Sequence, residues 1–313
     1  MNFSLPELHA SIEASVRQFA TTQVAPHAHA IEAGGDAFEK VYAALGDLDL
    51  GDLLVPEADG GLGLDPLALV LVVQTLAEVS PSLAWALALH AGPATIAQLR
   101  SGCGRPAERM SYGGFAPRSG SLWVLGEQVF GAAQLAVEAV DPMGLRGAGF
   151  ANATASGSPR ATLTPIDHAE CERMERLVRA AALVGCARGA LRAALDYAQE
   201  REQFGRPIAR FQAIQWKLAD GAVHCDAAEL MTHAAATSDT PHDAAAAVAF
   251  ASRVCVEVAS EALQVHGGYG YTTEFPVERL LRGARMLAGS DAARGDVAAA
   301  VARGDRRRAQ ART

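Results

Sequence analysis

The stretch Arg201-Glu-Gln-Phe-Gly-Arg-Pro-Ile-Ala-Arg-Phe-Gln212 interrupts two long segments that both have helical periodicity. A continuous amphipathic helix would not contain this Gly-x-Pro step, so the stretch predicts a turn between two helices. Its arginine and glutamine side chains suit an anionic ligand with several oxygens, such as a pyrophosphate. A solvated turn between two bundle helices would explain the same residues, and the chemistry alone leaves both interpretations open.

Helical periodicity on both sides of this stretch indicates a C-terminal four-helix bundle over residues 167–302. Apolar residues such as Leu177, Val184 and Leu191 recur at helical steps before the break. Asp167 and Glu170 have the spacing of a capping box at the start of this first helix. Three further helices are expected after the break, over residues 209–237, 242–266 and 276–287. The arginine-rich residues 303–313 are expected to form a flexible basic tail.

The first hundred residues predict an N-terminal helical domain, and a segment of different composition follows it. Helices are expected over residues 8–22, 36–48 and 66–91, with Pro81 dividing the last of them. Residues 101–166 are richer in glycine, serine and proline, and they contain short apolar runs that predict strands, one of them around Trp123. The fold class is therefore mainly α, with a small β-rich middle region between two helical domains.

Composition excludes several classes of protein. Of the 313 residues, 50% are hydrophobic and 20% are charged, as in globular proteins. The net charge of −8 argues against a nucleic-acid partner. The apolar run 67–77 is too short to span a bilayer, and the N-terminus lacks a signal-peptide pattern, so we expect a cytoplasmic protein without a membrane partner. Five scattered cysteines without a CxxC pair predict buried reduced thiols, and no metal site is expected.

A second motif, Gln264-Val-His-Gly-Gly-Tyr-Gly-Tyr271, stands at the end of another predicted helix. Gly267 and Gly268 can end this helix, and they would also let backbone amides approach a ligand closely. A plain helix end followed by a loop accounts for the glycines equally well.

Together these two motifs resemble the hallmarks of the acyl-CoA dehydrogenase family, whose first hallmark is "ERxQFGxPIxxFQ". The resemblance covers most of the chain. Residues 1–100 are similar to the N-terminal helical domain of the family, and residues from about 173 onward are similar to its C-terminal four-helix domain. Residues 141–149 resemble a late strand region of its middle β-domain. The middle domain, 101–166, is shorter than is usual in the family, and the loops that contact the flavin ring are not recognisable in it.

The resemblance implies an FAD-dependent enzyme that removes a proton from Cα of an acyl-CoA thioester and passes a hydride from Cβ to flavin N5. It implies a homodimer or homotetramer, with electron-transfer flavoprotein as the electron acceptor. A non-catalytic or half-catalytic subunit that pairs with a base-containing paralogous chain is the alternative. The positions that match FAD contacts, the first three of them across a dimer interface, are Arg201, Gln203, Phe204, Gln212, Gln264, Gly267 and Gly268.

The catalytic base is the point where the sequence departs from the family pattern, "RDAKxxxIYEGT". An ungapped alignment of the stretch after Arg282 places Asp291 on the family glutamate, whereas a three-residue deletion leaves no acid there. A minority of the family, similar to isovaleryl-CoA dehydrogenase, carries the glutamate before an arginine on an earlier helix. Met174-Glu-Arg-Leu-Val178 resembles that arrangement, so Glu175 is a candidate base and Arg176 a candidate substrate-binding residue. That Glu175 is an ordinary first-turn glutamate, or that the chain has no base, remain open alternatives.

Overall fold

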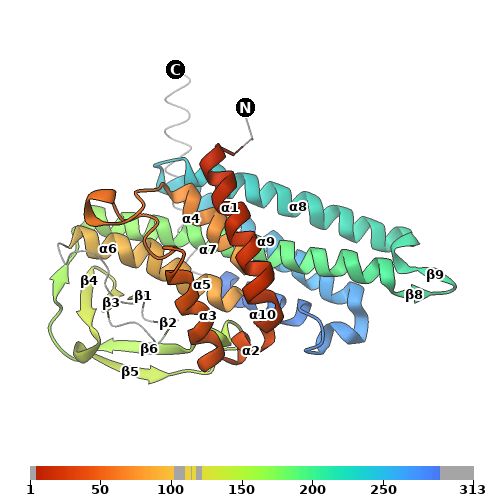
Figure 1. Cartoon of the computed structure of the whole chain (residues 1–313), viewed down its shortest axis with the longest axis horizontal. Helices are drawn as coiled ribbons and strands as arrows, with labels where there is room; N and C mark the ends of the chain where they lie inside the picture. Colours follow the sequence, from red (N-terminus) through yellow and green to blue (C-terminus); the bar gives the residue numbers. More distant parts are fainter. Residues whose placement is uncertain (1–4, 102–109, 114, 118–121, 290–313) are drawn as a thin grey trace, which may run out of the picture.

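The longest helix described, α7 (Pro165–Glu200), runs through the centre of the molecule and packs against helices of both the N-terminal and the C-terminal parts of the chain. The computed structural model describes residues 5–101, 110–113, 115–117 and 122–289. Three further helices complete the C-terminal bundle around α7, as expected from the periodicity (Figure 1). They are α8 (Gln212–Ala236), α9 (Pro241–His266) and α10 (Val277–Ala288). Asp291 and the predicted tail 303–313 lie outside the described residues.

The start of α7 differs from the capping box predicted for Asp167 and Glu170, and that prediction is wrong. Thr164 is the capping residue, because its Oγ1 accepts a hydrogen bond of 3.2 Å from the backbone N–H of Asp167. Pro165 then occupies the first helical position, where its missing N–H costs nothing. The carboxylate of Glu170 pairs instead with Arg173, at 2.7 Å.

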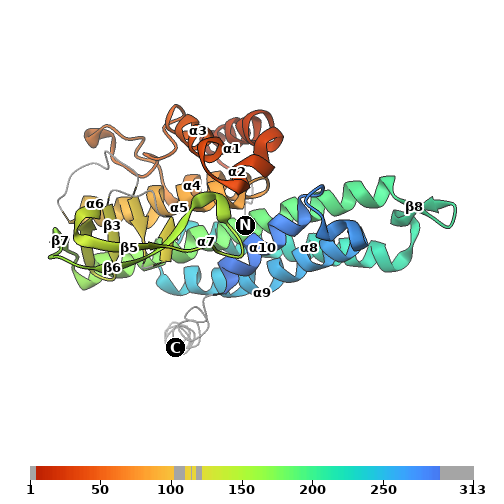
Figure 2. The same cartoon turned by 90° about the horizontal axis from the view of Figure 1, so that it is seen from below.

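The N-terminal helices form two layers, and the inner layer lies against α7. The outer helices α1, α2 and α3 lie on one side of α4 and α5, and the C-terminal bundle lies on the other (Figure 2). Pro81 divides the third predicted helix, as expected, and Ser80 caps the second half by accepting from the N–H of Leu83. The helices are α1 (Glu7–Phe19), α2 (Ala28–Ala33), α3 (Asp36–Gly46), α4 (Pro66–Ala77), α5 (Pro81–Leu89) and α6 (Thr95–Arg100).

Glycines allow α4 and α7 to approach each other at backbone contact. A Cβ on Gly185 would lie 2.3 Å from the carbonyl oxygen of Gln74, and one on Gly189 would lie 2.2 Å from that of Glu78. These distances are far below van der Waals contact, so the crossing requires glycine at both positions. It fixes the N-terminal helices onto the C-terminal bundle.

Two small sheets form the middle region, at the end of the bundle opposite the hairpin of β8 (Glu202–Gln203) and β9 (Arg206–Pro207) (Figure 1). One sheet has the strand order β1-β3-β4-β7 and the other β2-β6-β5, and only the β1–β3 pair among these strands is parallel. Trp123 on β3 is fully buried, which confirms that it belongs to a core strand. The strands are β1 (Met110–Tyr112), β2 (Phe115–Pro117), β3 (Leu122–Leu125), β4 (Gln128–Gly131), β5 (Leu135–Ala139), β6 (Phe150–Ala155) and β7 (Ala161–Thr162).

The described cysteines are buried thiols, as the sequence predicts. Cys171, Cys186, Cys225 and Cys255 are all free and buried. Burial raises the pKa of Cys171 and of Cys225 to about 12, so both thiols stay protonated at neutral pH. Within the described ranges, none of the helices combines the length and the apolar character needed to cross a membrane.

Candidate functional site

The break after α7 is a short hairpin that extends beyond the end of the bundle (Figure 1). Its strands are β8 (Glu202–Gln203) and β9 (Arg206–Pro207). Phe204 and Gly205 make the turn with φ angles of 53° and 76°. Glycine adopts such left-handed angles freely, whereas for a phenylalanine they cost roughly 1–2 kcal/mol. The predicted turn is therefore confirmed, and it takes the form of a β-hairpin with a strained aromatic residue at its tip.

The second motif ends α9 and forms a tight turn over Gly267–Tyr271. Gly267 has a φ angle of 59°, which favours glycine at this helix end. Among the described residues, a Cβ on Gly267 or Gly268 would meet no atom within 4 Å. The space beside this backbone is open, so a ligand can approach the peptide groups.

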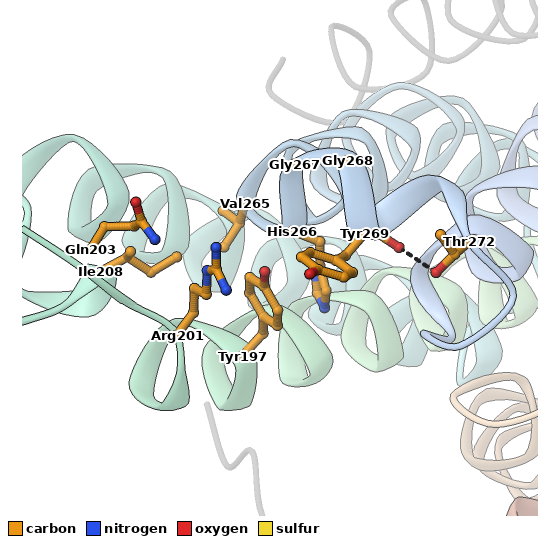
Figure 3. A pocket seen from close by; sticks show the side chains of 10 residues that line it. All are labelled: Tyr197, Arg201, Gln203, Ile208, Val265, His266, Gly267, Gly268, Tyr269 and Thr272. Atoms are coloured by element: carbon orange, nitrogen blue, oxygen red, sulfur yellow. Dashed lines mark hydrogen bonds between the residues drawn. The ribbon is translucent and has the colours of Figure 1, made fainter.

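The two motifs meet at one cavity of about 520 Å³ (Figure 3). Arg201 and Gln203 approach it from the end of α7 and from β8, and Gly267 and Gly268 approach it from the turn after α9. The guanidinium carbon of Arg201 lies 5.7 Å from the centre of the Tyr269 ring, which is the geometry of a cation–π contact. The remaining lining residues are Tyr197, Ile208, Val265, His266 and Thr272.

An aromatic cluster supports this cavity. The ring of Tyr197 stacks on that of His266 with centroids 4.4 Å apart, and Phe275 meets both rings at steeper angles. Such aromatic contacts contribute about 0.5–1.5 kcal/mol each beyond the area they bury. The cluster joins α7 to the end of α9, and so it holds the two motifs in register.

His266 presents an unused acceptor in this cluster. Its Nδ1 donates to the carbonyl oxygen of Ala262 at 2.8 Å, which assigns the proton to Nδ1. Burial lowers the pKa of His266, so the ring is neutral at pH 7. Its Nε2 is buried and has no hydrogen-bond partner among the described residues. Buried polar atoms are seldom left unpaired, so Nε2 suits a donor group of a bound molecule.

Four of the seven predicted FAD-contact residues line this cavity: Arg201, Gln203, Gly267 and Gly268. The other three are exposed and do not line it. Phe204 is 93% exposed at the hairpin tip, Gln212 begins α8, and Gln264 lies in the last turn of α9.

Sequence reasoning missed the aromatic members of the site. His266 and Tyr269 lie inside the second motif, but the residues of that motif expected at a ligand were its glycines and Gln264. Tyr197 lies one helical turn before Arg201 and therefore on the same face of α7. This four-residue spacing is the sequence feature that could have identified Tyr197 as a residue of the site.

The candidate base Glu175 lies well inside α7, about three turns after its start, so the interpretation as a first-turn glutamate is wrong. Its Oε1 accepts a hydrogen bond of 2.8 Å from Nε of Arg179 and another from Nη2 of the same guanidinium. Both side chains are largely buried, with 15% and 18% exposed. Arg176 lies 3.7 Å from the carboxylate of Glu172. The other candidate base, Asp291, is not among the described residues.

Profiles of one protein family match most of the chain. "Acyl-CoA dehydrogenase, N-terminal domain" matches residues 6–103, and "Acyl-CoA dehydrogenase, C-terminal domain" matches residues 170–300. This chain belongs to the acyl-CoA dehydrogenase family.

Individual relatives agree with this family assignment. The probable acyl-CoA dehydrogenase FadE25 of Mycobacterium tuberculosis is 28% identical over 364 aligned positions, covering 91% of this chain and 92% of that protein. The caffeyl-CoA reductase-Etf complex subunit CarC of Acetobacterium woodii is 43% identical over 117 residues, covering 36% of this chain and 31% of CarC. The structure of butyryl-CoA dehydrogenase from Megasphaera elsdenii has the same fold, with a TM-score of 0.80 at 20% identity over 92% of this chain and 95% of that one. Since 364 positions exceed the 313 residues of this chain, FadE25 contains residues that this chain lacks.

Acyl-CoA dehydrogenases are FAD-dependent oxidoreductases that act on CH–CH groups, and this chain is an enzyme of that class with FAD as its cofactor. The cavity at Arg201 and Gly268 fits part of such a cofactor. It combines an arginine, an amide side chain, open glycine backbone and the buried unpaired Nε2 of His266. These are groups that bind phosphate oxygens and nucleoside hydroxyls or amines.

Proposed function

We propose that this acyl-CoA dehydrogenase oxidises an acyl-CoA thioester between Cα and Cβ, with FAD held at the cavity between the two motifs. The observation that carries the proposal is that Arg201, Gln203, Gly267 and Gly268 line one cavity although 64 positions separate Gln203 from Gly267. The bound FAD supplies the acceptor for the hydride that leaves Cβ.

Five residues of the cavity have a defined role in this proposal. The guanidinium of Arg201 would pair with pyrophosphate oxygens, and the backbone N–H groups of Gly267 and Gly268 would donate to them. The amide of Gln203 binds a neighbouring polar group of the cofactor. The unpaired Nε2 of His266 accepts a hydrogen bond from the nucleoside part.

A second chain completes the site in this proposal. Phe204 is 93% exposed on the hairpin, and Trp216 and Val223, seven residues apart on α8, are 62% and 66% exposed. Residues spaced by seven share one face of a helix, so α8 presents an apolar stripe that no described part of the chain covers. We assign this stripe to the interface with a second copy, across which Arg201, Gln203 and Phe204 contact the FAD that serves Glu175 of the neighbouring chain, with Gln212 and Gln264 as further contacts.

Glu175 takes the proton from Cα in this proposal, and Arg176 contacts the substrate. A general base must reach the Cα proton with a free lone pair and must be fixed in place by its neighbours. Glu175 is largely buried and held by Arg179, next to the last turn of α10. Those features suit a base in a water-poor pocket better than a surface carboxylate.

The half-catalytic subunit is the second candidate, and the same ion pair favours it. Oε1 of Glu175 is already engaged by the guanidinium of Arg179. A carboxylate tied up in this way would leave proton abstraction to a paralogous partner chain. The two candidates differ in whether the chain is active alone.

An electron-transfer flavoprotein in the cytoplasm is the electron acceptor in this proposal. The relative CarC is named as a subunit of a complex with Etf, and it is 43% identical to this chain over 117 residues. The buried, protonated thiols suit a reducing compartment.

The test is anaerobic mixing of the FAD-loaded protein with a panel of acyl-CoA thioesters of different chain length and branching. The proposal expects at least one thioester to bleach the flavin absorbance of the protein alone. Bleaching only after co-purification with a longer paralogue would establish the half-catalytic subunit. Failure of the chain to bind FAD would refute both.

A further inference from the structure

Glu175 and Arg179 are neighbours on one face of α7, four residues apart. Two hydrogen bonds from the guanidinium, from Nε and Nη2, both end on Oε1 of the carboxylate. Among the described residues no hydrogen bond ends on the second carboxylate oxygen, Oε2, which therefore remains to accept a proton. The pair fixes which oxygen is engaged and which is available.

Contacts from two other helices hold the guanidinium of Arg179. Its Cζ lies 5.6 Å from the ring centre of Trp85, a residue of α5 that is only 6% exposed. Its Nη1 donates at 3.4 Å to the carbonyl oxygen of Leu287, in the last turn of α10. The last carbonyls of a helix lack partners within the helix and attract cations, so this contact is favourable.

Arg179 thus has a fixed position that does not depend on Glu175 alone. Helices α5, α7 and α10 meet at this guanidinium, and the carboxylate is held against a support that these helices keep in place. A catalytic group gains from such support, because a base that wanders from the reacting proton loses most of its effect.

We propose that Arg179 is the positioning residue of the catalytic base: it binds Oε1 of Glu175 so that Oε2 receives the Cα proton. This inference rests on the proposed function. In the reaction the Cα–H bond breaks and its proton goes to Oε2. The electron pair of that bond forms the Cα–Cβ double bond as a hydride leaves Cβ for FAD, the oxidant.

The geometry of this support requires arginine. Two donors of one planar guanidinium reach a single oxygen while its face covers the Trp85 ring and a third donor reaches Leu287. The ammonium of a lysine is a point charge with neither the fork nor the flat face. Arg179→Lys therefore retains the charge and loses the orientation.

The test measures the rate of flavin bleaching by the most reactive acyl-CoA, in single turnover at saturating substrate, with the FAD-loaded protein. Glu175→Gln is expected to lose about 10²–10⁴-fold, the usual contribution of a general base. Arg179→Met and Arg179→Lys are expected to lose roughly 10–100-fold in rate with the apparent Kd for substrate unchanged, since an ångström of misplacement costs that much. The double variant Glu175→Gln/Arg179→Met is expected to be no slower than Glu175→Gln, because residues that act as a unit are not additive.

The matched control is Arg173→Met. Arg173 also lies on α7, is buried, and pairs with Glu170 three residues away, but it bonds to the carbonyl of Ser238. Its loss should leave the rate of bleaching unchanged. If Arg179→Met misfolds, Arg179→Lys provides the same comparison.

Unchanged rates in both Arg179 variants, or a double variant slower by the product of the single effects, would overturn the inference while leaving the proposed function intact. A wild-type protein that no thioester bleaches would instead overturn the proposed function, and with it this role for Arg179.

Discussion

Arg201 and Tyr269 are 68 positions apart in the sequence, yet the guanidinium carbon of one lies 5.7 Å from the ring centre of the other. The contact joins the end of α7 to the turn that follows α9. Both residues line the cavity to which we assign FAD. The contact therefore places the hairpin motif and the glycine motif at the same ligand.

Gly268→Ala should weaken FAD binding without weakening the fold. The added methyl group meets no described atom within 4 Å in the protein, but it narrows the approach to the backbone N–H groups. We expect roughly tenfold weaker binding by fluorescence titration, equal to about 1.4 kcal/mol, with an unchanged melting temperature. Gly267→Ala provides the contrast, since its φ angle of 59° should cost stability as well. Equal FAD affinity in Gly268→Ala and wild type would disprove the role of this backbone.

Val223→Glu should disrupt assembly. The side chain of Val223 is 66% exposed on the apolar stripe of α8, and a carboxylate there would be buried without a partner at an interface. Light scattering should show a smaller particle than the wild type, with weaker FAD binding. Leu48→Glu alters an apolar residue that is 41% exposed on the N-terminal domain, and it serves as the control. An unchanged particle mass in Val223→Glu would show that α8 is not the interface.

Much of the fold followed from sequence periodicity, because helical spacing and proline positions depend on local chemistry. Pro81 divided its helix as expected, and the break after α7 fell at Phe204 and Gly205. The helix cap was mispredicted because the helix begins three residues earlier, where Thr164 accepts a hydrogen bond from the backbone N–H of Asp167 itself. The sequence contains both Thr164 and Asp167 as possible caps, and the backbone conformation decides which of them caps the helix.

The sequence predicted only part of the candidate site, because contacts between distant helices cannot be read from local motifs. Arg201 and Gly268 belong to recognisable motifs, whereas Arg179, which holds Glu175, does not. Trp85 reaches Arg179 because α5 packs on α7, a contact between residues 94 positions apart. Nothing in the local sequence around either residue indicates that contact.

Gly189→Val should severely destabilise the protein. Its Cβ would lie 2.2 Å from the carbonyl oxygen of Glu78, so α7 and α4 would have to separate. Overpacking of this kind costs about 1–3 kcal/mol or more, which urea denaturation can measure. Gly46→Ala is the comparison, because its Cβ meets no described atom within 4 Å at the end of α3. Stability equal to wild type in Gly189→Val would contradict the close crossing of these helices.

The free energy of unfolding should decrease as the pH is lowered, partly because His266 is protonated more readily in the unfolded chain. Burial lowers the pKa of folded His266 below its ordinary value of 6.5, so the unfolded chain binds the proton more readily. The stabilisation is complete above about pH 6.5 and is lost as the pH falls toward the folded pKa, by at most about 1.4 kcal/mol per pH unit for one proton. His266→Phe keeps an aromatic ring beside Tyr197 and should flatten this dependence in urea unfolding between pH 7 and pH 5. Parallel pH profiles for variant and wild type would exclude this contribution.

The cavity between the two motifs binds FAD in this proposal, and titration of the Arg201→Ala variant with FAD is the decisive experiment for it. Loss of a charge-assisted contact to phosphate costs about 1.5–3 kcal/mol, so the variant should bind FAD about 10–100-fold more weakly than wild type. Arg253→Ala is the matched control, because Arg253 also covers an aromatic ring, that of Phe250 at 5.8 Å, away from the cavity. We expect a yellow wild type, a yellow Arg253→Ala variant, and an Arg201→Ala variant that loses its flavin on gel filtration. Retention of FAD by Arg201→Ala with wild-type affinity would show that this cavity does not bind the cofactor.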